Sequence, residues 1–513
     1  MLKVLFVAAE AVPFAKTGGL GDVIGTLPKE LRKQGVDARV MIPRYEGIAG
    51  NFKEQMEVKA EFIVPVGWRH QYCGVQYLEH QNVPFYFIDN EDYFKRPGFY
   101  GYYDDGERFT FFCRAVLQAL PEIEFKPDII HCHDWHTGMV SVFLKAHYWA
   151  QEFYQDIHTL FTIHNLRYQG IFPKEIVPDL LALDWEYFNN GGIEFYDKVS
   201  FMKGGLVFSD LISTVSKTYA EEIQYPFYGE QLDGLLRHRQ DALVGIVNGI
   251  DYEEYNPATD EKIPVKYSVN SLELKRENKE KLQERLGLSV RDDVPLIGIV
   301  SRLVGPKGLD LVERVLYEML TFDDMQFVVL GTGEWKYEHL FQHAAWQYPD
   351  RVSANIYFDD ALARQIYAGA DMFLMPSQYE PCGIGQLIAM RYGSVPIVRE
   401  TGGLKDTIKS YNQITGNGNG LSFANYNAHD MMHTIRSAIQ LFKNKTVWHN
   451  IIKNAMQTDF SWRRSARRYV ELYERVTGGT PDRYDVQDRD AASDDDHAFL
   501  EGIEFGVNVD DVL

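Results

Sequence analysis

The stretch Lys16-Thr17-Gly18-Gly19-Leu20-Gly21-Asp22-Val23 lies between a predicted strand and a predicted helix. The apolar run at residues 3–9 is typical of a buried parallel strand, and apolar residues recur at helical spacing from 23 to 31. Glycine N–H groups and the start of a helix can bind an anion, and Lys16 adds a positive charge. The alternative is a tight turn beside a surface lysine, because the stretch matches neither the dinucleotide motif nor the Walker motif.

Apolar runs alternate with helical stretches along the rest of the chain, which is the pattern of βαβ units in a doubly wound sheet. One series of strands is expected at residues 3–9, 38–42, 83–88, 127–132, 158–163, 210–215 and 243–247. A second series is expected at residues 295–300, 325–330, 371–375 and 394–398. The polar stretch 251–295 between them lacks strands and holds a predicted helix at 271–286. We therefore expect an α/β protein of two doubly wound Rossmann-like domains, 1–250 and 251–458, facing each other across a cleft.

Composition limits the classes of function. The 513 residues carry a net charge of −21, which argues against nucleic acid as a main partner. The four cysteines are scattered without a CxxC pair, so a disulfide framework or a zinc knuckle is not expected. The sequence shows neither a signal-peptide pattern nor an apolar run of spanning length, so we expect a cytoplasmic protein that does not enter a membrane. The sequence leaves open whether the protein forms a homo-oligomer.

The last part of the chain differs from the rest. Residues 481–513 carry eleven acidic residues against two arginines, so much of the negative charge lies there. We expect residues 478–513 to be an exposed and disordered acidic tail; a functional role is the less favoured alternative.

Polar residues gather where the predicted strands end, which is the edge at which open α/β sheets bind ligands. In the first half these segments are His131–His136, His164-Asn165 and Asn248–Asp251. In the second half they are Ser301–Leu303 with Lys307-Gly308, Glu380–Gly383 and Glu400–Gly403. Two glycine loops, three cations (Lys16, Arg302 and Lys307) and one carboxylate would then converge on one cleft. Such a set suits a sugar linked through a diphosphate.

These segments, in this order over residues 1–476, make the chain resemble the bacterial glycogen synthases and plant starch synthases, a family of retaining glycosyltransferases. The resemblance implies the GT-B fold and transfer of glucose from ADP-glucose to the non-reducing end of an α-1,4-glucan such as glycogen. It implies no cofactor and no metal. The implied mechanism is departure of the diphosphate, an oxocarbenium-like sugar, and attack by the acceptor 4-hydroxyl from the same face. A leaving phosphate oxygen would accept the proton.

The resemblance also implies residue roles. Arg302 and Lys307 match the cations that neutralise the leaving diphosphate. Glu380 matches the carboxylate that binds glucose hydroxyls, and His164 matches the histidine that holds the glucosyl 6-hydroxyl. Donor-binding residues are implied to be Lys16, Gly18, Gly19, Asp22, Asn248, Tyr357 (stacked on adenine), Cys382, Gly383, Thr401, Gly402 and Gly403. Acceptor-side residues are implied to be Asp134, Trp135 and Asn165.

Several of these residues have a simpler interpretation. Tyr357 can be ordinary packing, and Arg302 can be a surface residue. Cys382 is favoured as a packing thiol rather than a nucleophile, since no base partner is evident. The three histidines His131, His133 and His136 could suggest a metal site, but sugar-binding loop histidines are the favoured interpretation.

Two positions depart from the family pattern. Gly385 stands where Thr or Ser is common, and Pro306 stands where Gln is common; neither change removes a charge. Residues 459–477 form a predicted amphipathic helix, which in the family returns to the N-terminal domain. Three alternatives stay open: a different donor such as UDP-glucose or another acceptor, a sugar-nucleotide epimerase, and a non-catalytic glucan-binding protein.

Overall fold

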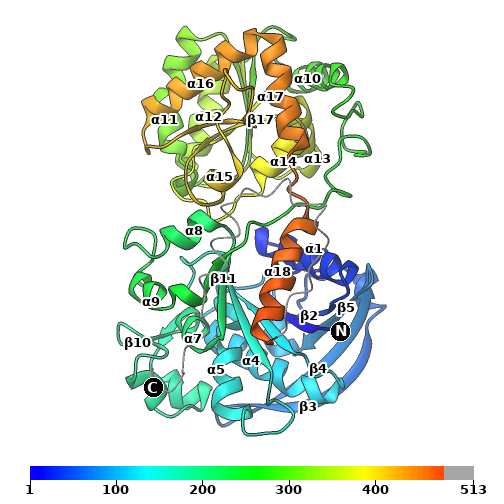
Figure 1. Ribbon diagram of the computed structural model, residues 1–513, viewed down its shortest axis with the longest axis vertical. Helices are drawn as coiled ribbons and strands as arrows, with labels where there is room; N and C mark the ends of the chain where they lie inside the picture. Colours follow the sequence, from blue (N-terminus) through cyan, green and yellow to red (C-terminus); the bar gives the residue numbers. More distant parts are fainter. Residues whose placement is uncertain (479–513) are drawn as a thin grey trace. The chain divides into compact units, whose positions relative to one another are not determined.

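The structure, a computed structural model, describes residues 1–478 (Figure 1). These residues form two compact units, each with its own sheet. Unit 1 comprises residues 1–215, 220–246 and, within the described part, 465–478; unit 2 comprises residues 216–219 and 247–464. The acidic tail expected at 478–513 lies outside the described residues, apart from Gly478.

The sheet of unit 1 has seven neighbouring parallel strands in the order β12-β11-β7-β6-β1-β2-β5. The strands are β1 (Lys3–Val7), β2 (Asp37–Pro43), β5 (Val83–Asp89), β6 (Ile129–His133), β7 (His158–Ile163), β11 (Leu211–Thr214) and β12 (Leu243–Gly245). Each one lies at a position predicted from an apolar run, so these predictions are confirmed. The runs were recognisable because a parallel strand is buried on both faces.

A long antiparallel hairpin, which was not predicted from the sequence, continues this sheet. Strands β3 (Glu57–Val66) and β4 (Arg69–His80) pair with each other, and β4 pairs with β5. The hairpin was missed because β3 exposes one face to solvent and carries an alternating pattern in place of an apolar run.

Helices and a small second sheet complete unit 1 (Figure 1). The helices are α1 (Gly19–Lys33), α2 (Gly50–Lys53), α3 (Glu91–Phe94), α4 (Asp105–Glu122), α5 (Gly138–Phe143), α6 (Glu186–Asn189), α7 (Phe201–Phe208), α8 (Lys217–Glu222, which begins in unit 2) and α9 (Asp233–His238). The small sheet has the strands β8 (Ile171–Pro173), β9 (Glu194–Phe195) and β10 (Lys198–Ser200).

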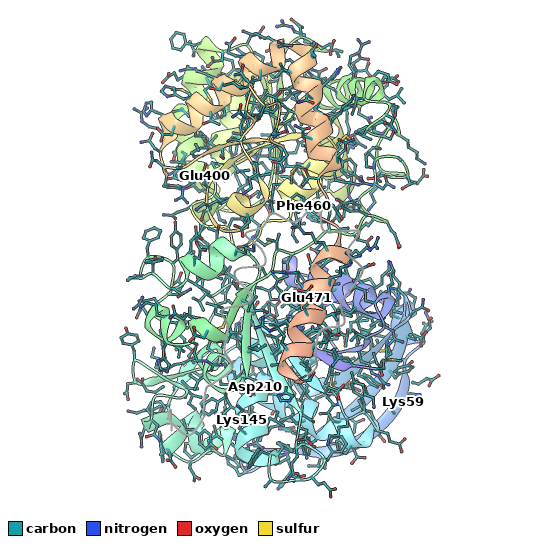
Figure 2. All side chains as sticks on the ribbon, viewed as in Figure 1. Lys59, Lys145, Asp210, Glu400, Phe460 and Glu471 are labelled. Carbon is teal, nitrogen blue, oxygen red and sulfur yellow. The ribbon has the colours of Figure 1, made fainter. Side chains whose placement is uncertain are left out.

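Asp210, directly before β11, accepts hydrogen bonds from Thr159 of β7 and pairs with Lys145 at 3.2 Å (Figure 2).

The sheet of unit 2 has six parallel strands in the order β15-β14-β13-β16-β17-β18. They are β13 (Leu296–Val300), β14 (Gln326–Leu330), β15 (Val352–Asn355), β16 (Met372–Met375), β17 (Val395–Arg399) and β18 (Leu421–Phe423). Four of them were predicted; β15 and β18 were not. The helices are α10 (Glu273–Leu286), α11 (Leu309–Phe322), α12 (Trp335–Gln347), α13 (Asp360–Gly369), α14 (Gly385–Arg391), α15 (Gly402–Thr407), α16 (Ala428–Lys443) and α17 (Lys445–Gln457). Helix α10 confirms the helix predicted at 271–286.

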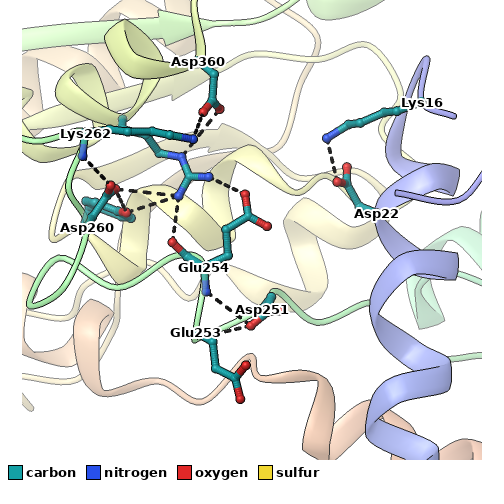
Figure 3. Close-up of polar contacts among 10 residues, drawn as sticks. Lys16, Asp22, Asp251, Glu253, Glu254, Asp260, Lys262 and Asp360 are labelled. Carbon is teal, nitrogen blue, oxygen red and sulfur yellow. Dashed lines mark hydrogen bonds and ion pairs between the residues drawn. The ribbon is translucent and has the colours of Figure 1, made fainter. Parts of the chain in front are cut away.

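The polar segment that precedes α10 is held to the rest of unit 2 by the buried Arg364, and the acidic partners of this arginine, Glu254, Asp260 and Asp360, are labelled in Figure 3. The Arg364 guanidinium lies 2.5 Å from a carboxylate oxygen of Glu254, 3.7 Å from Asp260 and 3.6 Å from Asp360. Asp251 accepts hydrogen bonds from the backbone N–H groups of Glu253 and Glu254. The segment therefore has a fixed path despite its low content of regular structure.

The last helix, α18 (Trp462–Val476), is amphipathic, as predicted. Its apolar face is buried and its first arginines are exposed. The Tyr473 hydroxyl lies 2.8 Å from Nδ1 of His131 in β6, so the end of this helix packs on the sheet of unit 1. No helix within residues 1–478 is both long enough and apolar enough to cross a membrane.

Candidate active site

The glycine loop after β1 is organised by a buried carboxylate. Glu10 accepts hydrogen bonds from the Thr17 N–H and hydroxyl, both at 2.5 Å, and from the Gly18 N–H at 3.3 Å. Burial raises the pKa of Glu10, and these hydrogen bonds oppose that rise. Glu10 was not among the residues predicted from the sequence. Its signal was a charged residue directly after an apolar run, six residues before Lys16.

Lys16 and the start of α1 form the exposed part of this loop. The Lys16 ammonium pairs with Asp22, in the first turn of α1, at 2.6 Å (Figure 3). Gly18 precedes the helix and Gly19 is its first residue, and a side chain at Gly18 would meet no atom within 4 Å. Because Glu10 already binds the Gly18 N–H, an external anion would have to use the N–H groups of the first helical turn.

Asp134 connects the loops after β6 and β7. Its carboxylate accepts the backbone N–H of His164 at 2.8 Å and that of Asn165 at 3.3 Å. Its backbone has φ of +56°, a conformation that non-glycine residues seldom adopt. Burial raises the pKa of Asp134 to about 7, although the two N–H groups act to lower it. Asp134 therefore fixes the loop that carries His164.

The histidines of β6 and β7 form a buried group in unit 1. His131 lies between the Tyr473 hydroxyl and the Thr162 hydroxyl, and His133 Nδ1 lies 3.0 Å from His164 Nε2. Burial lowers the pKa of His164 to about 3 and that of His136 to about 3, and it moves the pKa values of His131 and His133 well below the usual value. These rings are neutral at neutral pH. Among residues 1–478, no three His, Cys, Asp or Glu side chains are grouped so that they could hold a metal ion.

The two remaining acceptor-side predictions differ in exposure. Asn165 is half-buried, and its side-chain oxygen accepts the N–H of Arg167 at 3.1 Å. Trp135 is only 9% exposed and stacks on His136 with ring centroids 4.0 Å apart. A Cβ at Gly170 would lie 2.3 Å from the indole, so this glycine allows the chain to pack directly on the ring. Most of Trp135 is therefore occupied by packing within unit 1.

In unit 2, the predicted cations and carboxylate follow neighbouring strands. Lys307 ends a short turn after β13, and its ammonium lies 2.6 Å from a carboxylate oxygen of Glu380. The same oxygen accepts a hydrogen bond from Ser377 at 3.1 Å. Glu380 is 8% exposed, whereas Arg302 is exposed and makes no ion pair within residues 1–478. One carboxylate is thus fixed by a cation while a second cation is available to a ligand.

The glycine turn at the start of α15 packs on the Glu380 segment. The Gly403 N–H donates to the carbonyl oxygens of Glu380 and Pro381, at 3.2 and 3.1 Å. A Cβ at Gly402 would lie 2.0 Å from the Glu380 carbonyl oxygen, and one at Gly403 would lie 2.1 Å from the Cys382 carbonyl oxygen. The two glycines therefore allow these loops to touch. Because the Gly403 N–H already donates to these carbonyl oxygens, it does not bind a phosphate in this structure. Thr401 is buried and directly precedes the helix. Gly383 makes a turn with φ of +74°.

Three further residues that were predicted on the donor side lie in unit 2. Tyr357, after β15, is 46% exposed and its hydroxyl bonds Asn355, so it is accessible to a ligand. Asn248 is buried, and its side-chain oxygen has no hydrogen-bond partner within the described part of the chain. Burial raises the pKa of the Cys382 thiol to about 12, which suits a packing thiol and not a nucleophile.

Comparison with known proteins gives the family. A family model described as "Starch synthase catalytic domain" matches residues 3–238, and one described as "Glycosyl transferases group 1" matches residues 280–458. The chain is 59% identical to the glycogen synthase of Geobacillus thermodenitrificans over 475 residues, which is 93% of this chain and 98% of that protein. The chain belongs to the bacterial glycogen synthase family. The glycogen synthase of Clostridium acetobutylicum, 56% identical over 477 residues, supports the same assignment.

Solved structures agree with this family membership. The catalytic domain of starch synthase IV from Arabidopsis thaliana, bound to ADP and acarbose, has a TM-score of 0.86 and 33% identity, covering 93% of this chain and 99% of that one. A sucrose-phosphate synthase from Thermosynechococcus elongatus, with a TM-score of 0.59 and 16% identity, shows the same fold only. This family member is thus a glycosyltransferase of the GT-B fold, with two α/β units built on parallel sheets.

Proposed function

We propose that this glycosyltransferase moves glucose from ADP-glucose to the non-reducing end of an α-1,4-glucan, with retention of configuration. The observation that carries the proposal is the Lys307–Glu380 pair at 2.6 Å, together with the exposed Arg302 that follows the same strand as Lys307, β13, and makes no ion pair within residues 1–478. The names of the relatives and the ADP in the starch synthase support the donor and the acceptor.

Arg302 and Lys307 bind the diphosphate in this proposal. The guanidinium can donate two parallel hydrogen bonds to phosphate oxygens. The Lys307 ammonium has three N–H donors, and Glu380 takes one of them, so others remain for the leaving oxygen. As the bond between the anomeric carbon and the phosphate oxygen breaks, both electrons of the bond go to that oxygen, where the two cations stabilise the charge.

Glu380 is assigned to the glucosyl hydroxyls. Its carboxylate is held by Lys307 and Ser377, so it does not need to reorganise when positive charge develops on the sugar ring. The acceptor 4-hydroxyl then bonds to the anomeric carbon, and its proton goes to the phosphate oxygen that has left. The products are a glucan one residue longer and ADP.

The other residues serve binding. His164 is assigned to the glucosyl 6-hydroxyl, and Lys16 with the first turn of α1 is assigned to the donor in unit 1. Tyr357 is assigned to the adenine, and Asn248, with its unpartnered side-chain oxygen, to a polar group of the donor. The acceptor-side roles of Asp134 and Asn165 stay proposals, with Asp134 acting through the backbone of His164. All four cysteines are free thiols, which suits a reducing compartment such as the cytoplasm.

The test is incorporation of labelled glucose into glycogen by the full chain, from ADP-glucose and UDP-glucose in parallel. We expect incorporation from ADP-glucose at a much higher kcat/KM. Incorporation from UDP-glucose alone would correct the donor, and none from either would overturn the enzyme assignment. A Lys307→Met variant should lose most of the activity, while Lys336→Met, which removes an exposed lysine paired with Glu313, should keep it.

A further inference from the structure

The side chain of His133 contacts the ring of His164. Its Nδ1 lies 3.0 Å from His164 Nε2, within hydrogen-bond distance. The opposite nitrogen of His133, Nε2, is buried and has no hydrogen-bond partner within residues 1–478. His164 itself is partly exposed, and its Nδ1 makes no hydrogen bond within the same residues. One nitrogen of His164 is therefore used by the protein, and the other is left for a ligand.

The His133 ring is fixed on both sides. Phe6 stacks on it with ring centroids 5.6 Å apart and an angle of 14° between the planes, and His131 lies 4.1 Å away. His131 is held in turn by the Thr162 and Tyr473 hydroxyls, at 2.6 and 2.8 Å. These contacts leave His133 little freedom to turn, so its Nδ1 stays directed at His164.

The arrangement of partners favours one position for the shared proton. Burial lowers the pKa of both rings, so each is neutral at neutral pH and carries one N–H. If His164 donated from Nε2, His133 would carry its proton on the buried Nε2, where the N–H would have no acceptor. Buried N–H groups without acceptors are rarer than buried acceptors without donors. The hydrogen bond is therefore donated by His133 Nδ1 and accepted by His164 Nε2, which leaves the proton of His164 on Nδ1.

We propose that His133 is a positioning residue that fixes the His164 ring with its proton on Nδ1, so that His164 donates a hydrogen bond to the 6-hydroxyl oxygen of the donor sugar. The hydrogen bond to the 6-hydroxyl rests on the proposed function, whereas the position of the proton on His164 Nδ1 does not. The consequence is specificity: a donor that lacks the 6-hydroxyl leaves this N–H without an acceptor, which is costly in a partly buried site.

The first test is ¹⁵N nuclear magnetic resonance of the full chain with labelled histidine. The chain has 15 histidines, and the His164 signals are assigned by their loss in a His164→Asn variant. We expect His164 Nδ1 to show the shift of a protonated ring nitrogen and Nε2 that of an unprotonated one. The reverse pattern would overturn the proposal. This readout needs no substrate, so it stands even if the chain transfers no glucose from ADP-glucose.

The second test uses a matched pair of variants at His133. His133→Asn carries an amide close to the position of Nδ1 and can still donate to His164, whereas His133→Leu is of similar size and cannot. We expect the wild-type ratio of kcat/KM for ADP-glucose over ADP-6-deoxyglucose to be at least about tenfold. The ratio should fall toward one in the Leu variant and be retained in the Asn variant.

The outcomes separate positioning from a merely structural role. If both variants fold, as judged by their melting temperatures, and both retain the wild-type ratio, His133 does not position His164. If both lose activity for the two donors equally, the loss is structural and the specificity claim is wrong. If the Leu variant does not fold, the wild-type ¹⁵N pattern still decides the position of the proton, and loss of the ratio in a folded Asn variant would contradict the proposal.

Discussion

Replacement of Glu380 by Gln tests the sugar-binding role most sharply among the single substitutions. The glutamine keeps the shape, and its carbonyl oxygen can still accept from Lys307 and Ser377, which now lie 2.6 and 3.1 Å from the carboxylate. Only the negative charge is lost. Removal of one preorganised electrostatic contact costs about 10²–10³ in turnover, or roughly 3–4 kcal/mol of transition-state stabilisation.

The stability of the folded protein and its binding of ADP-glucose should change much less than the turnover. Lys307 is 24% exposed, so water can compensate the unpaired ammonium, and we expect about 1 kcal/mol of lost stability. For a unit of this size that corresponds to a fall of about 2–4 °C in the melting temperature. The Lys307 ammonium, no longer neutralised by a carboxylate, can bind the diphosphate at least as well as before, so KM for ADP-glucose should stay within about tenfold.

The assay is steady-state glucosyl transfer, with thermal melting of the same samples. Glu313→Gln is the matched control, because Glu313 pairs with Lys336 at 2.7 Å on an exposed surface; it should leave kcat unchanged. Near-normal turnover of Glu380→Gln together with a lowered melting temperature would show that Glu380 has a structural role and does not bind the sugar.

Three other perturbations have defined outcomes. Burial holds the pKa values of four histidines low, while it raises those of Glu10 and Asp134. Below pH 6.5 the unfolded histidines take up protons that the folded ones cannot, whereas the two carboxyl groups act in the opposite sense. Because the histidines outnumber the two carboxyl groups, unit 1 should become less stable as the pH falls from 7 to 5.5; unchanged denaturant midpoints at the two pH values would contradict this. Tyr357→Ala should raise KM for ADP-glucose about tenfold through lost stacking, while Phe358→Ala, at a neighbouring residue 92% exposed, should not; equal KM values would remove Tyr357 from the donor site. A chain ended after Gly479 should keep transfer activity, because the relatives align over 475 residues and nearly all of their own length; a folded but inactive product would contradict this.

The sequence predicted the central strands of both sheets well, for a physical reason. Strands buried on both faces are continuous apolar runs, and β1, β6 and β13 lie where such runs were seen. The hairpin β3–β4 is half-exposed, so its signal is an alternation that is easily lost among loops. Strands β15 and β18 include polar residues and partly exposed positions, so neither is a continuous apolar run.

Contacts within the candidate site were less predictable than its residues. Lys307 and Glu380 were both predicted, but 73 residues separate them, and only the neighbouring positions of β13 and β16 bring them together. Glu10 was missed because its burial and its bonds to the glycine loop depend on the folded chain. Trp135 was expected on the acceptor side, and its close packing on Gly170 depends on a contact that no sequence pattern records.

We propose that Arg302 and Lys307 neutralise the leaving diphosphate in this glycosyltransferase without help from a metal. The direct measurement is the initial rate of glucosyl transfer from ADP-glucose to glycogen by the full chain, with and without excess EDTA. We expect equal rates in the two conditions. A rate that is lost in EDTA and restored by magnesium or zinc would contradict it and return the histidines of β6 to consideration as ligands.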